Sequence, residues 1–397
     1  MSTLSTPNNP FNPGSGVPPP YLAGREKHLE KFAQMLNRIK EGQIENLIVY
    51  GLRGTGKTVL MDEFSKSCIS HGFLPVKRSQ FSKKYCDPDE FTKALKYDIK
   101  TAIRTFSRVK RMKDKFTSVL SYIRPKEVGI PDVFYYEPSY NTTSGIPFED
   151  HLKEYLLANW KVFENGNYKG VIFLFDEFHS VYDIEYKKWF VLSDFIGVLN
   201  EVQKKHCKYF AVFCGLPNLH LNVKEARSYS ERMYKSMEVG NLNREEATSA
   251  IVTPLDRSEF QFEKPLIERI VVETGQYPYF IQFYCKELIN MSGKKKILLN
   301  DYERFSPSIT KQLDDDFFDP RMDALSDEEQ KVIIAMAHAK DMDIPFDFIK
   351  KKARIERTTL SKYMKRLEDK GLIYNYKRGV YRFSVPLLKK YILRKFT

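Results

Sequence analysis

Four runs of apolar residues and one further strand-like segment are spaced along the first part of the chain, and stretches with helical periodicity separate them. Within the four runs the residues show little alternation between apolar and polar, which is typical of strands buried on both faces of a parallel sheet. The pattern therefore predicts an α/β fold in which helices cover both faces of one parallel sheet. The expected strands are 46–50, 73–76, 168–175, 209–214 and 236–239.

Apolar residues three and four positions apart predict the helices that connect these strands. A second helical series follows residue 243 and predicts a small all-helical lid over 244–252, 265–274 and 279–291. The helices expected before it are 26–39, one that starts near Gly56, one or two over 88–122, 148–163 and 185–205.

The last 72 residues predict a separate unit of three helices and a hairpin. Ser326 is expected to cap the first helix, and Thr358 or Thr359 the third. The second helix is expected at 344–353, and 372–383 has the alternation and the central glycine of a hairpin with a basic tip. Three helices followed by such a hairpin are typical of a winged helix-turn-helix.

Composition indicates where these units meet. Residues 1–20 are rich in Pro, Ser, Asn and Gly, and we expect them to form an extended arm. Residues 123–147 contain Pro and Gly among aromatic residues and are expected to form a loop or a small β-insertion. The expected divisions after the arm are a sheet domain at 21–240, the lid at 241–300, a linker at 301–325 and the last unit at 326–397.

The segment after the first strand carries the clearest chemistry. Residues 51–58, GLRGTGKT, fit G-x-x-x-x-G-K-[ST] at every fixed position. Glycines let backbone N–H groups turn toward phosphate oxygens, and the following helix adds its positive end. Lys57 would bind the β- and γ-phosphates and Thr58 would bind Mg²⁺. A chance Gly-rich turn is the alternative, and the flanking strand and helix disfavour it. The expected ATP ligands here are Gly51, Arg53, Gly54, Thr55, Gly56, Lys57 and Thr58.

Two acids end the apolar strand at 168–175. Magnesium requires hard oxygen ligands beyond water and phosphate, and Asp176 lies where a parallel strand would supply one. Glu177 then becomes the base that polarises the attacking water. Acids often end strands, so this pattern gains its weight from the phosphate-binding loop upstream. His179 could face the same site, although a packed or surface histidine is the favoured interpretation.

Composition also excludes several classes of protein. With 42% hydrophobic and 29% charged residues, the chain is expected to be globular rather than disordered. No apolar run approaches the roughly 20 residues of a membrane span, and the N-terminal stretch lacks the pattern of a signal peptide. The five cysteines form no C-x-x-C pair, which disfavours a disulfide framework or a zinc site. We therefore expect a cytoplasmic protein without a membrane partner.

The net charge of +13 is concentrated near the C-terminus, where the last 72 residues hold 18 Lys and Arg against 9 Asp and Glu. Such an excess favours double-stranded DNA as a partner, with a solubilising surface and a protein-docking module as alternatives. The basic helical stretch at 88–122 is interpreted first as a solvated face. The residues expected to contact DNA are Thr359, Ser361, Lys362, Lys365, Arg366, Lys377 and Arg378.

Three further features leave alternatives open. Arg232 precedes the fifth strand and could complete a neighbouring subunit's nucleotide site or lie in a surface ion pair. A polar residue after the fourth strand would sense the γ-phosphate, and only Cys214 and Asn218 are candidates there. The run Asp314-Asp315-Asp316 could bind a metal, but a solvated helix end or a contact with the basic C-terminal unit is favoured.

Together these motifs resemble the AAA+ ATPases of the origin-recognition and initiator clade, nearly from end to end. The resemblance implies a strand order of 5-1-4-3-2 and places Tyr21, Leu22 and Ala23 beside the adenine. Initiators usually carry a sensor arginine where this lid has Gly275-Gln276-Tyr277-Pro278, so the resemblance does not extend to that residue. The segments that carry it are PPPYLAGRE, GLRGTGKT, LFDEFH, FAVFCGLPNL, SERMYKSMEVGNLNREEA, TGQYPYFIQ and the region from LSDEEQKVIIAMA to GVYRFSVPLLKKYI.

The sequence thus predicts an ATP- and Mg²⁺-dependent ATPase, slow or stimulated by a partner, with Glu177, Lys57 and Arg232 in catalysis. It would couple its nucleotide state to DNA binding through the winged helix and act as a homo-oligomer. The alternative is a STAND-like ATP-dependent switch in transposition or defence, whose winged helix docks a protein. A steep salt dependence of binding would favour DNA, because phosphate contacts release counterions.

Overall fold

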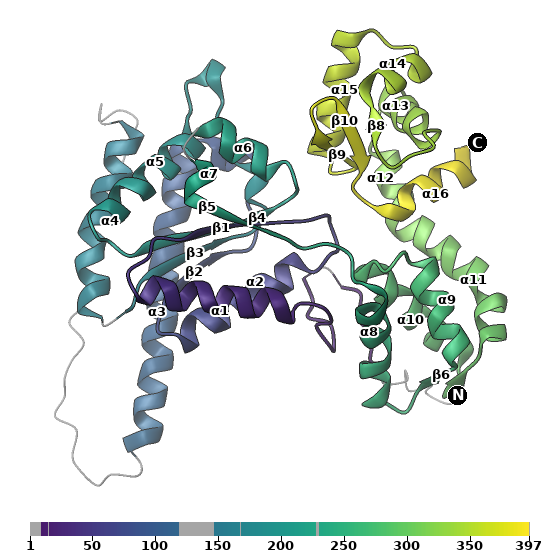
Figure 1. Cartoon of the computed structure of the whole chain (residues 1–397), viewed down its shortest axis with the longest axis horizontal. Helices are drawn as coiled ribbons and strands as arrows, with labels where there is room; N and C mark the ends of the chain where they lie inside the picture. The colour runs from purple at the N-terminus through teal and green to yellow at the C-terminus, as the bar shows by residue number, and fades with distance from the viewer. Residues whose placement is uncertain (1–8, 15, 119–146, 167, 228–229, 397) are drawn as a thin grey trace, which may run out of the picture.

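The structure is a computed structural model of the whole chain that describes residues 9–14, 16–118, 147–166, 168–227 and 230–396. Figure 1 shows a central sheet between helices, a group of helices beside it and a smaller unit that ends the chain. The first eight residues of the expected arm, and all but the last residue of the expected insertion at 123–147, lie outside the described residues.

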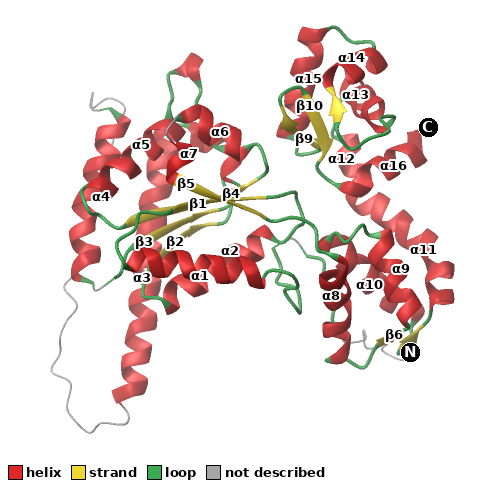
Figure 2. Cartoon of the chain, in the orientation of Figure 1, coloured by secondary structure: helices red, strands yellow, loops and turns green. Residues whose placement is uncertain are grey.

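The strands of the central sheet are β1 (Asn46–Tyr50), β2 (Leu74–Arg78), β3 (Val171–Phe175), β4 (Tyr209–Gly215) and β5 (Tyr234–Glu238). They are parallel and lie in the order β2-β3-β4-β1-β5, coloured yellow in Figure 2. From the opposite edge this is 5-1-4-3-2, so the order that the resemblance implied is confirmed. The strands that precede the phosphate-binding loop and the two acids, β1 and β3, both flank β4.

Helices cover both faces of this sheet, as the apolar runs predicted. Val171, Phe173 and Phe175 of β3 face one side and Ile172 and Leu174 face the other, because side chains alternate along a strand. Burial of each such side chain stabilises the fold by about 1.5–3 kcal/mol. One face packs against α1 (Glu26–Lys40) and α2 (Lys57–Ser70), and the other against α3 (Pro88–Ser118), α4 (Phe148–Asn165) and α5 (Val191–Lys204).

The predicted lid contains α8 (Arg244–Asp256), α9 (Lys264–Glu273) and α10 (Pro278–Ser292). It is not entirely helical, because β6 (Gln261–Phe262) and β7 (Lys296–Ile297) pair as a short parallel ladder. Two-residue strands are too short to produce a readable alternation in the sequence.

The described part of the N-terminal segment is extended, as expected, but it packs against the lid. Phe11 is only 2% exposed and belongs to the apolar core of the lid, with its ring 6.3 Å from that of Phe262. The Asn9 side chain donates hydrogen bonds to the Lys286 carbonyl at 3.0 Å and to Asn290 Oδ1 at 2.9 Å. The described part of the N-terminal segment therefore forms part of the lid's packing.

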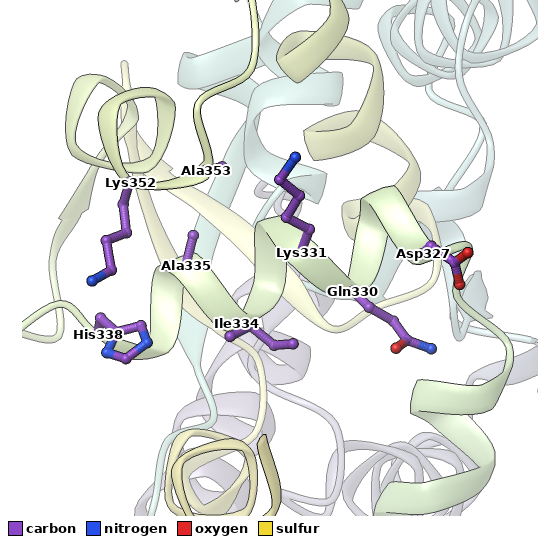
Figure 3. Close-up of a pocket in the computed structure, with 8 residues that line it drawn as sticks. All are labelled: Asp327, Gln330, Lys331, Ile334, Ala335, His338, Lys352 and Ala353. Atoms are coloured by element: carbon purple, nitrogen blue, oxygen red, sulfur yellow. The ribbon is translucent and has the colours of Figure 1, made fainter. Parts of the chain in front are cut away.

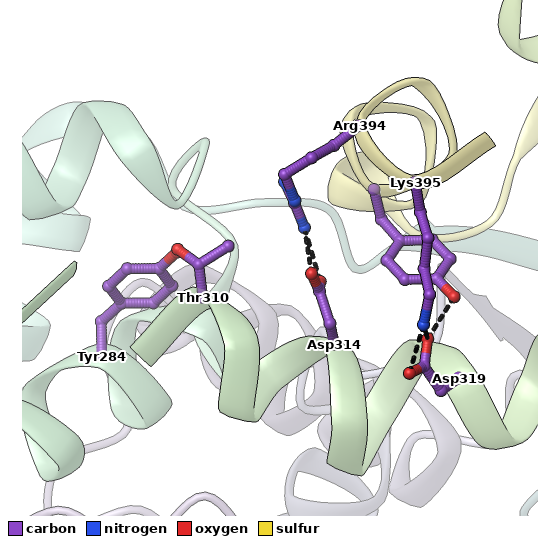
Figure 4. Close-up of polar contacts among 7 residues, drawn as sticks. Tyr284, Thr310, Asp314, Asp319, Arg394 and Lys395 are labelled. Atoms are coloured by element: carbon purple, nitrogen blue, oxygen red, sulfur yellow. Dashed lines mark hydrogen bonds and ion pairs between the residues drawn. The ribbon is translucent and has the colours of Figure 1, made fainter. Parts of the chain in front are cut away.

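The segment expected to be a linker at 301–325 is helical instead. It comprises α11 (Leu299–Leu313), a π-helical turn at Asp314–Phe318 and α12 (Asp319–Asp323). Figure 4 shows that two of its acids contact the end of the chain: Asp314 pairs with Arg394 at 2.5 Å, and Asp319 pairs with Lys395. Of the alternatives for the acidic run, a contact with the basic C-terminal unit is thus present at Asp314.

The last unit contains the three predicted helices, α13 (Asp327–Ala337), α14 (Phe346–Ala353) and α15 (Arg357–Asp369), and the predicted hairpin of β9 (Ile373–Lys377) and β10 (Val380–Phe383). Ser326 caps α13 as predicted. The cap of α15 was predicted wrongly: Glu356 holds that position, so Thr358 and Thr359 lie within the first turn. A third strand, β8 (Ile344–Pro345), pairs with β10, and α16 (Pro386–Phe396) closes the unit.

The helix expected at 185–205 is shorter than predicted. Only α5 is regular, because Lys188 adopts a left-handed backbone conformation and Ile184 pairs with Trp189 across the resulting turn. The basic stretch from residue 88 forms the single long helix α3 up to Ser118. Within the described ranges, no helix is both long and apolar enough to cross a membrane.

Candidate functional site

The phosphate-binding loop joins β1 to α2, and its glycines meet steric requirements that other residues could not. Gly54 and Gly56 have φ of 78° and 88°, in the left-handed region, and Gly56 caps α2. A Cβ at Gly51 would lie 2.2 Å from the Val239 carbonyl oxygen. Lys57 is buried and its Nζ donates to the Leu52 carbonyl at 2.8 Å, so the ammonium group lies across the loop. The loop thus has the backbone conformation that an anion cradle requires.

The acids after β3 lie against this loop. Thr58 Oγ1 donates to Asp176 Oδ2 at 2.6 Å, although the two residues are 118 positions apart in the chain. The Glu177 backbone N–H donates to Asp176 Oδ1 at 2.9 Å, and Glu177 itself has a left-handed φ of 55°. The predicted pair of Thr58 and Asp176 is therefore brought together at the end of the sheet where β1 and β3 finish.

His179 is packed beside these acids. Its Nε2 lies 3.7 Å from Glu177 Oε2, and burial, together with the nearby Lys57 and Arg53 charges, lowers the pKa of His179 to about 3. The imidazole is therefore neutral at physiological pH. It contacts Glu177, while its backbone carbonyl accepts from Asn222 at 3.1 Å.

The donor set fits a magnesium nucleotide. A threonine hydroxyl and a carboxylate are the hard oxygen ligands that Mg²⁺ prefers, and a P-loop site leaves the remaining positions to phosphate and water. In the described residues, no group of three or more His, Cys, Asp or Glu side chains is arranged to hold a metal. A site completed by the substrate is consistent with that finding.

Comparison with protein families agrees with this geometry. Residues 21–180 match the family of AAA ATPase domains. The sheet domain therefore has the P-loop AAA+ fold. Residues 315–392 match a second family, described only as a domain of unknown function. No curated protein matches the chain.

Solved structures with a similar fold span nearly the whole chain. The Walker-type ATPase of Pyrococcus abyssi is 12% identical with a TM-score of 0.57, and the match covers 94% of this chain and 96% of that one. The ORC2 protein of Aeropyrum pernix, solved in ADPNP–ADP complexes, is 15% identical (TM-score 0.49, covering 96% and 97%). The ORC1 protein of Aeropyrum pernix, solved with DNA, is 11% identical (TM-score 0.47, covering 97% and 96%).

Sequence reasoning missed one residue that supports the P-loop. Arg25 is only 3% exposed, and its Nη2 donates to the carbonyls of Thr55 at 2.9 Å and Gly240 at 2.8 Å. It thereby links the loop to the segment after β5. The signal in the sequence was Gly24-Arg25 before α1, but its partners are distant in the chain. Ala23 is buried in the lid core and Leu22 is half-buried, and their placement beside adenine stays a prediction.

The two sensor candidates differ in what they offer. Cys214 is fully buried in β4, where burial raises the pKa of its thiol. Asn218 lies just after β4, and its side-chain Oδ1 is buried without a hydrogen-bond partner. That oxygen is a hydrogen-bond acceptor and cannot bond to phosphate oxygens, so its lack of a partner does not identify Asn218 as the sensor.

The C-terminal unit contacts the P-loop directly. A Cβ at Gly371, immediately after α15, would lie 2.3 Å from Arg53 Nε, so the P-loop arginine lies against this glycine. Lys83 pairs with Asp369 at 2.7 Å. Lys365 lies 5.8 Å from the ring centre of Tyr182. The end of α15 therefore rests on the nucleotide-binding part of the molecule.

The remaining predicted site residues are exposed. Arg232 lies at the end of α7 (Ser230–Met233), just before β5. The residues expected to contact DNA, Thr359, Ser361, Lys362, Lys365, Arg366, Lys377 and Arg378, are also exposed. Lys365 lies 3.7 Å from Asp369 and Lys377 lies 3.9 Å from Asp343, so their charges are partly balanced within the chain.

A hollow of about 350 Å³ lies in the C-terminal unit, away from these groups (Figure 3). The side chains of α13 and α14 line it, with Lys331, His338 and Lys352 among them. It contains none of the predicted nucleotide or DNA ligands.

Proposed function

We propose that the protein binds Mg²⁺–ATP at the P-loop and hydrolyses it. The observation that carries this proposal is the 2.6 Å contact between Thr58 and Asp176, because it joins the loop to the acids after β3. Lys57 would hold the terminal phosphates, and Glu177 would accept a proton from the attacking water. Magnesium, when bound, would neutralise charge on the phosphates.

Two substitutions test this assignment. Lys57→Ala should abolish nucleotide binding, because it removes the cation that holds the β- and γ-phosphates. Glu177→Gln should bind ATP with unchanged affinity and lower kcat about 100-fold or more, since it removes the general base but keeps the shape. Equilibrium binding of ATP and steady-state hydrolysis measure the two effects separately. Undiminished turnover in Glu177→Gln would remove this residue from catalysis.

We further propose that the C-terminal unit is a winged helix that binds double-stranded DNA. All seven predicted DNA residues are exposed, and three of the five charged ones, Lys362, Arg366 and Arg378, form no ion pair in the part of the chain that the structure describes. The end of α15 contacts Arg53 of the P-loop. A conformational change at the P-loop would therefore be transmitted directly to the proposed recognition helix. This contact supports coupling between nucleotide state and DNA binding.

The DNA proposal is tested by the ATPase rate and by the affinity for duplex DNA over a series of salt concentrations. DNA should stimulate hydrolysis, and the slope of log K against log salt should be steep. The double variant Lys362→Ala/Arg366→Ala removes two proposed phosphate contacts. The magnitude of that slope should therefore fall by about two. Lys204→Ala/Lys205→Ala removes the same charge from the exposed end of α5 and should leave the slope unchanged.

One observation favours the alternative, a nucleotide switch that docks a protein. Lys365 and Asp369 of α15 already contact Tyr182 and Lys83 of the sheet domain, so this helix acts as a docking surface within the chain. A switch of this kind would hydrolyse ATP without regard to DNA and show no salt-sensitive retention on it. That result would replace the DNA proposal and leave the ATPase proposal in place.

A further inference from the structure

Two arginines at the P-loop have no acidic partner. Arg53 belongs to the loop, and Arg321 belongs to α12, after the lid. In the described residues neither forms an ion pair, and Arg321 donates only to the Phe317 carbonyl while its guanidinium lies 3.8 Å from the Phe317 ring centre. Burial, followed by the nearby Arg53 charge, lowers the pKa of Arg321. Like charges held together in a half-buried position are unfavourable unless an anion joins them.

Aromatic residues of the lid hold Arg321 against the loop. A Cβ at Gly54 would lie 3.1 Å from Tyr277 Cε1 and 3.1 Å from Tyr279 Cβ, so both tyrosines pack on this glycine. The Tyr279 ring centre is 5.2 Å from that of Phe317, over which Arg321 lies. Contacts therefore run without a gap from the P-loop glycine to Arg321.

Two donors in this cluster are buried without a hydrogen-bond partner. They are Arg53 Nε and the hydroxyl of Tyr277, a residue that is 1% exposed. The Tyr277 hydroxyl would lie 3.6 Å from a Cβ at Gly54, which places it at the loop. Native structures rarely leave buried donors unsatisfied, so each points to a group that binds there.

We propose that Arg53, Arg321 and Tyr277 form a subsite that binds the terminal phosphate of ATP. The inference rests on the proposed nucleotide binding at the P-loop and adds the residues that distinguish ATP from ADP. Guanidinium groups suit this task, because their planar donors match phosphate oxygens. The lid stretch Gly275–Pro278 contains no Lys or Arg. In the proposed subsite, Arg321 of α12 provides the positive charge instead.

The position of Arg321 gives the subsite a second consequence. Arg321 lies on α12, which leads directly into α13 of the C-terminal unit. Arg53 meets the same unit at Gly371. Binding or loss of the terminal phosphate would therefore affect two links to the proposed winged helix, one through α12 and one through the contact of Arg53 with Gly371.

The test compares the affinities of the full chain for Mg²⁺–AMP-PNP and Mg²⁺–ADP. Arg321→Gln, which keeps most of the side-chain stem, and Arg321→Ala should weaken AMP-PNP binding about 10- to 100-fold, the worth of one charge-assisted hydrogen bond. ADP binding should change by less than about threefold and shows that the variants are folded. Arg304→Ala is the control, because Arg304 also lies over a phenylalanine, Phe305, but on the exposed face of α11.

The outcomes separate the two proposals. Equal losses for both nucleotides in Arg321→Gln, or no loss for either, would overturn the subsite and leave the ATPase proposal standing. Wild-type protein that binds neither nucleotide, or Lys57→Ala protein that binds both normally, would overturn nucleotide binding at the P-loop and the subsite with it. A selective loss of AMP-PNP binding that Arg304→Ala does not show supports the subsite.

Discussion

At the scale of single residues, the sequence identified the groups whose partners lie within one motif or at strand ends. Lys57 and Thr58 are fixed by the P-loop pattern, and Asp176 follows from the rule that parallel strands end at the same edge. Arg25 and Arg321 could not be identified in this way. The partners of Arg25, Thr55 and Gly240, and the Arg53 charge near Arg321 come together only when the domains pack.

Arg25 provides a prediction at this scale. Arg25→Ala should lower the affinity for ATP about tenfold and destabilise the fold by about 2 kcal/mol, because two buried carbonyls lose a charged donor. Nucleotide titration and thermal unfolding measure these effects. Arg244→Ala, at an exposed position that begins α8, is the control and should change neither. Unaltered ATP affinity in Arg25→Ala would show that the P-loop keeps its shape without this arginine.

His151 gives the pH dependence of stability. It is 3% exposed, and burial, with the Lys96 charge, lowers its pKa to about 4 from the usual 6.5. Between these values the unfolded chain binds the proton and the folded chain does not, so the free energy of unfolding falls as pH falls from 6.5 to 4. The loss at this residue is about 2 to 3 kcal/mol.

Denaturant titrations at several pH values between 4 and 7 measure this loss. His151→Leu should flatten the dependence in that window, whereas His338→Leu, at an exposed histidine, should keep it. An unchanged pH dependence in His151→Leu would contradict the assignment of the proton uptake to this residue.

At the scale of elements, periodicity predicted the strands and most helices, and it failed where local backbone geometry or distant contacts decided. Lys188 breaks the helix expected at 185–205 through a left-handed conformation that periodicity does not report. The linker expected at 301–325 is helical, because Tyr302, Ile309 and Leu313 of α11 pack into the core of the lid. The contact with the basic C-terminal unit that the sequence analysis allowed for the acidic run is present, since Asp314 pairs with Arg394 of α16.

A prediction for α15, whose end rests on the P-loop, concerns the glycine that follows it, Gly371. Gly371→Ala should strain a left-handed backbone and also push the flexible end of the Arg53 side chain away from α15. Gly379→Ala imposes similar strain in the hairpin, where no atom lies within 4 Å, and serves as the control. Because the guanidinium group of Arg53 can shift at small cost, we expect Gly371→Ala to be less than about 1 kcal/mol less stable than Gly379→Ala by denaturant titration. A larger difference would mean that Arg53 is held rigidly against α15.

At the scale of the whole molecule, the parallel sheet separates Arg232 from the P-loop of its own subunit. Tyr234 pairs with Asn46 at the start of β1, whereas the P-loop follows Tyr50 at the end of that strand. The two positions are therefore a strand length apart, roughly 15 Å. A role for Arg232 in catalysis therefore requires the nucleotide site of a second subunit. The sequence analysis allowed this role, and an assembly experiment can test it.

Mixing two inactive variants tests this role. Arg232→Ala should hydrolyse ATP slowly while its nucleotide affinity is unchanged, and Lys57→Ala should not bind ATP. In a mixture, an intact P-loop from the first and an intact arginine from the second can share one site, so activity should return. Hydrolysis in the mixture no greater than the sum of the separate variants would contradict a shared site.

The N-terminal segment has a consequence for the order in which this chain folds. Asn9 and Asn290 are in contact across 281 positions, and Phe11 fills the core of the lid. During synthesis, therefore, this segment leaves the ribosome long before its binding site exists. The strands and helices of the sheet domain lie between Asn9 and Asn290 in the sequence, so this domain can fold first. Closure of the lid must wait for a contact of very high sequence separation. We expect the lid to acquire its final stability last, when Phe11 docks.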